Sequence, residues 1–174
     1  MNVDLSGTLN NLQANNLKLT TSTRTKIYGD INFKNLFNKE DNNFYMNGVF
    51  RDLTSTYTDL KSLLPNVLGD AIPTSFDRLG KFTIVGNSQI TTSTVKADIE
   101  INTDLGYVYS NLEISKINDI DNADYKGNVI FEQFDFGTFL NDSKIGIGSL
   151  NFNVNGKGFI SETLNTQVNG DIFE

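Results

Sequence analysis

The residues that could do chemistry in this chain are few. It contains no His and no Cys, which removes the usual zinc ligands, thiol nucleophiles and Ser–His–Asp triads. Asp119, Asp121, Asn122 and Asp124 bring oxygen atoms together, but they lack the glycine and the closing glutamate of an EF-hand calcium loop. Because turns favour Asp and Asn for conformational reasons, we expect a solvated hairpin turn there, and neither a metal nor another cofactor.

Two weaker patterns also fail to indicate catalysis. Glu100 and Glu113 are carboxylates of the kind that glycosidases use in pairs, yet nothing in the sequence places them at catalytic distance. The segments Gly146-Ile-Gly148 and Gly156-Lys-Gly158 contain the glycines of a phosphate loop, but neither opens a helix whose N-terminus would receive the phosphate. We therefore predict that the protein is not an enzyme.

The bulk composition narrows the class of protein further. The 174 residues carry a net charge of −7, so the surface repels phosphate backbones, and nucleic acid is not an expected partner. Phe and Tyr are plentiful although only 38% of residues are hydrophobic. No apolar run approaches the ~20 residues of a membrane-spanning helix.

Apolar and polar residues alternate along most of the chain, which is typical of strands with one apolar face. Val95 to Ile101 is the clearest example. About ten such runs predict an all-β protein with a mostly antiparallel sheet. The alternation changes phase between Leu105 and Ile114, which predicts a β-bulge near Ser110-Asn111. Residues 57–64 predict a short helix, residues 66–79 a loop with one helical turn, and residues 137–141 a second turn of helix.

An apolar-x-Gly-x-apolar pattern recurs at Leu5–Leu9, Ile27–Ile31, Tyr125–Val129 and Val168–Ile172. Glycine weakens a strand unless the backbone bends or another group approaches closely. The repeat therefore predicts a sheet that curls strongly about its apolar face. One short helix cannot cover ten strands, so either the sheet closes as a sandwich or barrel, or part of its apolar face stays open to a ligand. Pattern alone leaves both alternatives open.

Several segments resemble the repetitive periplasmic region of TamB-like proteins (translocation and assembly module) of Bacteroidota, within the AsmA-like group. They are Tyr57 to Asn66, Ile72-Pro73, Leu79 to Gly86, Asn102 to Gly106, Tyr125 to Gly127, and Phe134 to Leu140. The resemblance covers most of residues 3–172, and it depends on the order of these short pieces. It implies a taco-like β-groove, with residues 1–174 forming a single segment of a longer repetitive protein.

The resemblance also implies a function and a location. The parent protein would be anchored in the inner membrane and lie in the periplasm of the cell envelope. It would carry phospholipid between the inner and outer membranes and support outer-membrane biogenesis. Acyl chains would lie in a hydrophobic groove, at roughly 0.8 kcal/mol per buried CH₂. Other partners would be neighbouring segments of the parent chain and an outer-membrane assembly protein. The residues that we expect to line the groove are Ile27, Ile31, Phe33, Phe44, Phe50, Phe82, Ile84, Ile99, Ile101, Val129, Phe131, Phe152 and Val154.

Alternatives remain at this stage. The same apolar residues would form the core of a closed β-sandwich. An adhesive or carbohydrate-binding domain would instead present Tyr28, Tyr45, Tyr107 and Tyr109 on its polar face. A scaffolding segment would use its strand edges to pair with protein strands. The helix at 57–64 would plug the groove, gate it or cap a core, and capping is the expectation that we favour.

Overall fold

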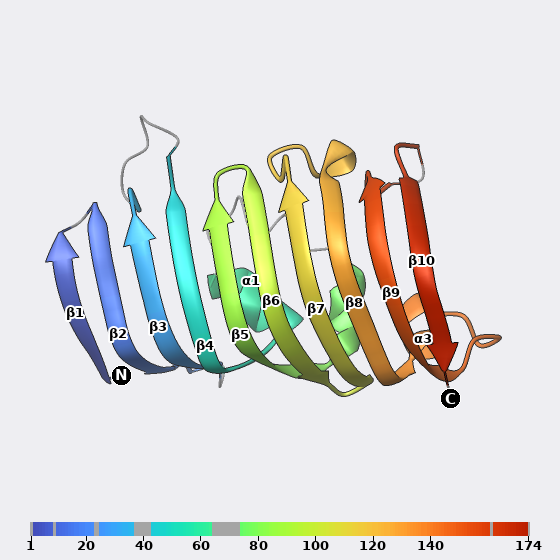
Figure 1. Cartoon of the computed structure of the whole chain (residues 1–174). Helices are drawn as coiled ribbons and strands as arrows, with labels where there is room; N and C mark the ends of the chain where they lie inside the picture. The colour runs from blue at the N-terminus through green and yellow to red at the C-terminus, as the bar shows by residue number, and fades with distance from the viewer. Residues whose placement is uncertain are drawn as a thin grey trace.

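The computed structural model describes residues 2–8, 10–22, 25–36, 43–63, 74–160 and 162–173. It confirms the all-β class and contains ten strands (Figure 1). The strands are β1 (Asn2–Thr8), β2 (Asn11–Thr20), β3 (Lys26–Lys34), β4 (Tyr45–Thr56), β5 (Lys81–Thr91), β6 (Thr94–Thr103), β7 (Gly106–Ser115), β8 (Asp124–Asp135), β9 (Ile147–Lys157) and β10 (Asn165–Phe173).

All ten strands form one sheet in the order of the sequence, from β1 at one edge to β10 at the other. Each strand is antiparallel to its neighbours. Within the described part of the chain, no second sheet packs on this one and the edges do not meet, so it is neither a sandwich nor a barrel. The strands bend towards the side on which the helices lie (Figure 1), which is consistent with a groove.

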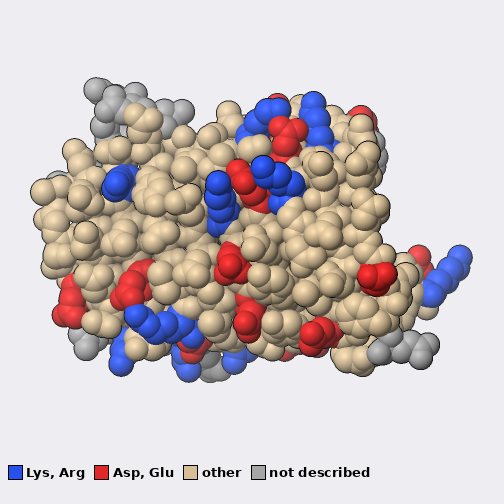
Figure 2. Space-filling view, in the orientation of Figure 1, with Lys and Arg blue, Asp and Glu red and all other residues tan. Residues whose placement is uncertain are grey.

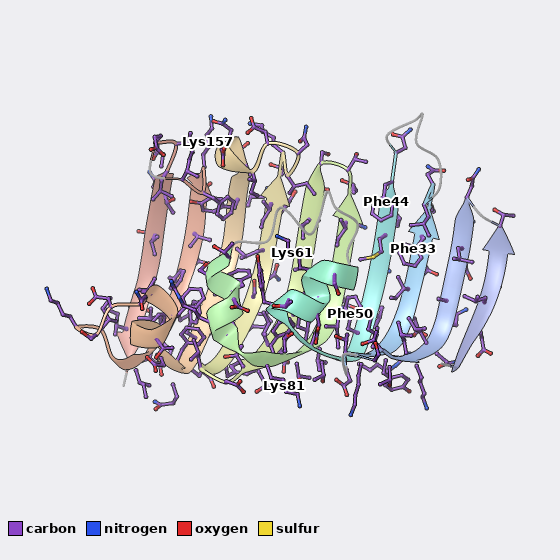
Figure 3. All side chains as sticks on the ribbon, turned by 180° about the vertical axis from the view of Figure 1, so that it is seen from behind. Phe33, Phe44, Phe50, Lys61, Lys81 and Lys157 are labelled. Atoms are coloured by element: carbon purple, nitrogen blue, oxygen red, sulfur yellow. The ribbon has the colours of Figure 1, made fainter. Side chains whose placement is uncertain are left out.

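Alternation gives the sheet two chemically different faces. The inner face carries the core residues, such as Phe50, Phe82, Val108 and Val129, and the helices lie against it (Figure 3). The outer face carries the Lys, Arg, Asp and Glu side chains that are scattered over the view in Figure 2. Because side chains point to opposite faces with a period of two, the register of each strand fixes which residues face inwards.

Three bulges interrupt this regular pairing. Asn15 and Asn16 lie opposite Asp30, where the pairing of β2 and β3 shifts between Ala14 and Leu17. A second shift occurs in β4 between Phe50 and Leu53, and a third in β8 between Phe131 and Phe134. Bulges add local twist and bend a strand, so these three contribute to the curvature of the sheet.

The bulge predicted near Ser110-Asn111 was wrong. Strand β7 pairs with β6 and β8 without a register shift. The apparent phase change arises because Tyr107 and Tyr109 belong to the outer face, where the hydroxyl of Tyr109 donates to Asp98 Oδ1 at 3.0 Å. Val108 and Ser110 are the buried, inward residues of this strand. Tyrosine can serve either face because its ring is apolar and its hydroxyl is polar.

The repeated glycines lie where neighbouring backbones come close. The register places Gly7 opposite Leu12, Gly29 opposite Phe50, and Gly170 opposite Phe152. A Cβ atom at Gly29 would stand 2.1 Å from the carbonyl oxygen of Val49, and one at Gly170 would stand 2.0 Å from that of Asn151. Any larger residue would push the strands apart, so glycine is required by close approach at these positions.

Short helices lie at one end of the strands, which we call the helix end; the opposite end is the turn end. Helix α1 (Tyr57–Leu63) follows β4, η1 (Thr74–Leu79) precedes β5, and α3 (Phe136–Leu140) follows β8. The predicted helix at 57–64 and the helical turn at 137–141 are therefore confirmed, apart from Leu64, which lies outside the described residues, as do residues 65–73. A 3-10 turn, η2 (Ile120–Asn122), lies at the turn end.

Candidate functional site

Four rows of inward-facing residues cross the sheet from strand to strand, and none of their members is charged. Beside Ser55, Phe82 and Thr103, which face inwards at the helix end of β4 to β6, runs the first long row, Leu19, Ile27, Leu53, Ile84, Ile101, Val108, Phe131, Leu150 and Ile172. The next two rows are Leu17, Gly29, Phe50, Gly86, Ile99, Ser110, Val129, Phe152, Gly170, and then Ala14, Ile31, Gly48, Ser88, Ala97, Leu112, Gly127, Val154, Val168. The turn-end row is Leu12, Phe33, Met46, Ile90, Val95, Ile114, Tyr125 and Gly156.

The helix end of the inner face holds two buried clusters. One contains Ile31, Phe50, Leu53 and Phe82, and Leu60 of α1 packs against it. The other contains Val108, Val129 and Phe134, with neighbours from η1 and α3. The half-buried Ile101 packs against both clusters and so connects them. This part of the face is an ordinary closed core, which supports capping as the role of α1.

The turn end of the same face is covered less. None of the residues Leu12, Phe33, Met46, Ile90, Val95, Ile114 and Tyr125 is fully buried; each is half-buried. Figure 3 shows Phe33 and Phe44 towards this end of β3 and β4, away from α1, and Phe50 nearer the helix. An apolar strip several strands wide therefore remains partly accessible. At β3 and β4 it adjoins the first cluster, because Phe33 and Met46 pack against that cluster.

The register places twelve of the thirteen predicted lining residues on the inner face of β3 to β9; Phe44 directly precedes β4 and has no register partner. Four of them belong to the closed clusters, because Ile31, Phe50, Phe82 and Val129 are buried. The others are half-buried, namely Ile27, Phe33, Phe44, Ile84, Ile99, Ile101, Phe131, Phe152 and Val154. Of these, Phe44, Ile99 and Val154 are not among the residues that pack against either cluster.

Sequence reasoning missed an aromatic cluster around α3. The rings of Phe134 and Phe131 lie 4.8 Å apart, and that of Phe134 lies 5.0 Å from Phe136 and 5.6 Å from Phe139. Simple alternation could not reveal it, because the bulge before Phe134 and the start of α3 after Asp135 change the period twice within a few residues. The available signal was the density of Phe between residues 131 and 139.

The outer face has a shallow hollow that, unlike the apolar inner face, is lined mainly by polar and charged residues. Tyr109, Asn111, Glu113, Lys126, Asn128 and Asn153 line it. Its charges are paired, because Glu113 lies 3.4 Å from Lys96 Nζ and 3.6 Å from Lys126 Nζ. Burial, followed by the charges of Glu100 and Glu132, raises the pKa of Tyr107 nearby. The carboxylate of Glu113 is therefore neutralised by the two lysines beside it.

The outer tyrosines do not form an exposed aromatic platform. Lys18 Nζ and the Arg51 guanidinium lie 5.1 and 5.2 Å from the centroid of the Tyr28 ring. Lys34 Nζ lies 5.5 Å from that of Tyr45. Tyr28, Tyr45 and Tyr107 also belong to three different strands. Their placement therefore does not favour a carbohydrate-binding site in which a sugar ring stacks on neighbouring tyrosines.

The candidate chemical residues behave as structural groups. Asn122 Nδ2 donates to Asp119 across η2, and Asp124 is paired with Lys116 Nζ at 2.6 Å. Among the described residues, no group of acidic side chains is arranged to hold a metal ion. Glu100 lies opposite Tyr109, and Tyr109 is four residues before Glu113 in β7. Four residues span roughly 13 Å along a strand. The two carboxylates are therefore further apart than those of a glycosidase pair. Gly148 and Gly156 belong to β9, which is followed by another strand.

Comparison with known proteins gives no identification. No family, no curated protein and no solved structure matches the chain. In the described part of the chain, the helices are all too short or too polar to cross a bilayer.

Proposed function

We propose that the chain is a non-enzymatic β-groove segment that binds phospholipid acyl chains along its inner face. In the setting that the resemblance to TamB-like proteins implies, it would carry phospholipid between the inner and outer membranes and support outer-membrane assembly from the periplasm. The observation that carries this proposal is the uncharged, half-buried apolar strip at the turn end of the inner face, which continues from β2 to β8.

The strip has the properties that an acyl chain requires. Each methylene that leaves water contributes about 0.8 kcal/mol, and an unbranched chain makes no hydrogen bond that would demand a polar partner. Residues such as Ile90, Val95 and Ile114 supply apolar contacts on successive strands. The zwitterionic or anionic head group would stay in water at the turn end. Because water solvates the head group there, the protein does not need a polar pocket to bind it.

The two buried clusters define the limits of this site. Because Leu60 and the aromatic residues of α3 already cover the helix end, the acyl chain has room only from Ile99 and Val154 towards the turn end. The site that we propose is therefore narrower than the whole inner face. A closed core and a lipid strip occupy the same sheet side by side.

Site-specific photo-crosslinking tests the proposal directly. A photo-reactive residue at Ile114, on the inner face, should crosslink to phospholipid when the protein is incubated with vesicles of phosphatidylethanolamine and phosphatidylglycerol. The same residue at neighbouring Glu113, on the outer face, is the matched control and should not. Equal labelling at both positions, or none at Ile114, would contradict the proposal. Native mass spectrometry of the purified protein gives an independent reading of bound lipid.

A further inference from the structure

A row of short polar side chains crosses the outer face from β5 to β9, on the side of the sheet that Figure 2 shows. The register pairs its members in turn from strand to strand, and they are Asn87, Asp98, Asn111, Asn128 and Asn153. Neighbours in such a row are about 4.8 Å apart, which is the spacing of adjacent strands. Each asparagine carries a carboxamide, which can donate and accept hydrogen bonds at the same time. The row therefore repeats one chemical group at a fixed interval.

Longer side chains stand on both sides of this row over β6 to β8. Those on the turn-end side are Lys96, Glu113 and Lys126, and those on the helix-end side are Glu100, Tyr109 and Ile130. Because asparagine is shorter than these residues, Asn111, Asn128 and Asn153 form the floor of the shallow hollow on this face. We call this hollow, with its floor of three asparagines, the asparagine trough. It runs across the strands.

The floor of the trough has polar groups that the protein itself does not use. Asn128 Nδ2 donates to Asn151 Oδ1 at 2.9 Å and lies 3.3 Å from Asn153 Oδ1. Among the residues that the structure describes, neither Asn153 Nδ2 nor the carboxamide of Asn111 has a hydrogen-bond partner. Asn111 and Asn153 are both exposed. Their donors and acceptors are therefore available to a ligand.

The charges around the trough favour an uncharged ligand. The two lysines of its turn-end side are both paired with Glu113, at 3.4 and 3.6 Å. The other charged residues beside the floor, Asp98 and Glu100, are negative. An anionic ligand would therefore meet no unpaired cation here, and it would lose hydration without compensation. A neutral ligand with many hydroxyl groups matches this surface.

The spacing of the floor distinguishes between two kinds of neutral polymer. An extended peptide advances by about 3.3 Å per residue, so its polar groups fall out of step with side chains that are about 4.8 Å apart. One pyranose unit of an extended glycan is close to the strand spacing in length, and each unit offers hydroxyl groups that both donate and accept. Alternate units of a cellulose-type chain also have the same orientation. Asn111 and Asn153, which are two strands apart, would therefore meet equivalent hydroxyl groups.

We propose that the asparagine trough binds an extended, uncharged glycan chain that lies across β7 to β9. Recognition uses hydrogen bonds from the carboxamides and needs no sugar ring stacked between tyrosines. Each such bond replaces one made with water, so its net contribution is small, and the glycan should bind with a Kd in the millimolar range. The trough and the apolar strip lie on opposite faces of the sheet, so this site does not depend on lipid binding.

NMR titration with cellohexaose tests the proposal. The side-chain amide resonances of Asn111, Asn128 and Asn153 should shift progressively with cellohexaose concentration, and that of Asn102, on the outer face of β6 but outside the trough, should not. Maltohexaose contains the same six sugars in a chain that curves instead of extending, and it should cause much smaller shifts. Absence of shifts at millimolar cellohexaose, or equal shifts with both sugars, would overturn the proposal.

Two exposed substitutions test the individual contacts. Asn111→Ala and Asn153→Ala each remove one carboxamide and should each weaken cellohexaose binding roughly two- to tenfold, the effect of losing one neutral hydrogen bond. Both variants should keep the melting temperature of the wild type, because neither residue is buried. Asn102→Ala is the matched control and should bind like the wild type. Unchanged affinity in both trough variants, or an equal loss in the control, would contradict the assignment.

Discussion

The backbone amide of Asn16 donates a hydrogen bond of 2.7 Å to Asp30 Oδ1 on the neighbouring strand. Asn16 has a positive φ of 50° and belongs to the bulge in β2. The bulge in β8 repeats the arrangement, since Gln133, with a φ of 48°, donates its amide to Ser149 Oγ at 3.1 Å. In both places, a side-chain oxygen on the opposite strand accepts a hydrogen bond from a backbone amide that the bulge leaves without a partner in the sheet. Arg51 also pairs with the Asp30 carboxylate.

Asp30 should make the stability of the protein depend on pH. The Asn16 amide and the Arg51 guanidinium lower the pKa of Asp30. A lowered pKa means that the carboxylate stabilises the fold at pH values above the carboxyl group's ordinary pKa, and that this contribution disappears as the pH falls through the lowered value. We expect Asp30→Asn to melt below the wild type at pH 7, and the difference to shrink below pH 4, since the ordinary pKa is 3.8. A gap that is constant with pH would contradict this. Asp77→Asn, on exposed η1, is the control.

Gly48 should not tolerate even one added methyl group. A Cβ atom there would stand 2.7 Å from Cζ of the Phe50 ring, and Phe50 is buried in a core cluster. Since the ring has little room to move, we expect Gly48→Ala to lower the free energy of unfolding by about 1–3 kcal/mol. Gly146→Ala is the matched control, because nothing lies within 4 Å of its added Cβ. Chemical denaturation measures both, and equal stability of the two variants would refute the packing argument.

Phe134 should be among the largest single contributors to stability. It is 1% exposed and its ring contacts three other phenylalanines. Truncating such a side chain leaves a cavity, so Phe134→Ala should cost about 3–5 kcal/mol. Leu140→Ala, at an exposed position of the adjacent α3, should cost little. Thermal and urea unfolding of the pair distinguishes a core around α3 from a loosely attached helix, for which both losses would be small.

Ile99 tests whether the strip beside the core is open. It is half-buried between Gly86 and Ser110, two small neighbours in its row. In an open strip the carboxylate of Ile99→Asp reaches water, so the variant should remain folded and lose lipid crosslinking at Ile114. In a closed core the same carboxylate would be buried without a partner, at a cost of several kcal/mol. Collapse of the variant, together with a wild type that never crosslinks, would exclude the strip as a lipid site.

Chelation should leave the protein unchanged. Asp119 accepts from Asn122, and Asp124 pairs with Lys116, so their oxygens already have partners. We expect EDTA and excess Ca²⁺ to have no effect on the melting temperature. A rise with Ca²⁺ that Asp121→Ala abolishes would reveal a site at residues 119–124.

The strands could be predicted from the sequence because alternation is a local property. Val95 to Ile101 alternates without interruption, and β6 pairs with both neighbours in the matching register. The short helix after Thr56 was also predictable, since Leu60, Leu63 and Leu64 recur at helical spacing in the sequence and a proline follows. The inner position of the predicted lining residues followed from the same alternation.

The bulges and the division of the inner face could not be predicted in this way. The bulge at Asn16 depends on a carboxylate 14 residues away, which no local pattern contains. Likewise, whether Phe82 or Val95 is covered depends on where α1, η1 and α3 lie over the sheet. Alternation identifies the face to which a residue belongs, but only the tertiary structure decides what covers it.

The sequential strand order has a consequence for how the protein folds. Each strand pairs only with its neighbours in the chain, so the loops that close on folding are short, apart from the connection between β4 and β5, and their entropic cost is low. Hairpins can form one after another, and the effect of a local defect decreases with distance from it, as in a one-dimensional repeat array. Amide hydrogen exchange should then be slowest in β4 to β8 and faster towards both edges. The same modular order would allow a hairpin to be gained or lost in evolution without rearranging the strands that precede it.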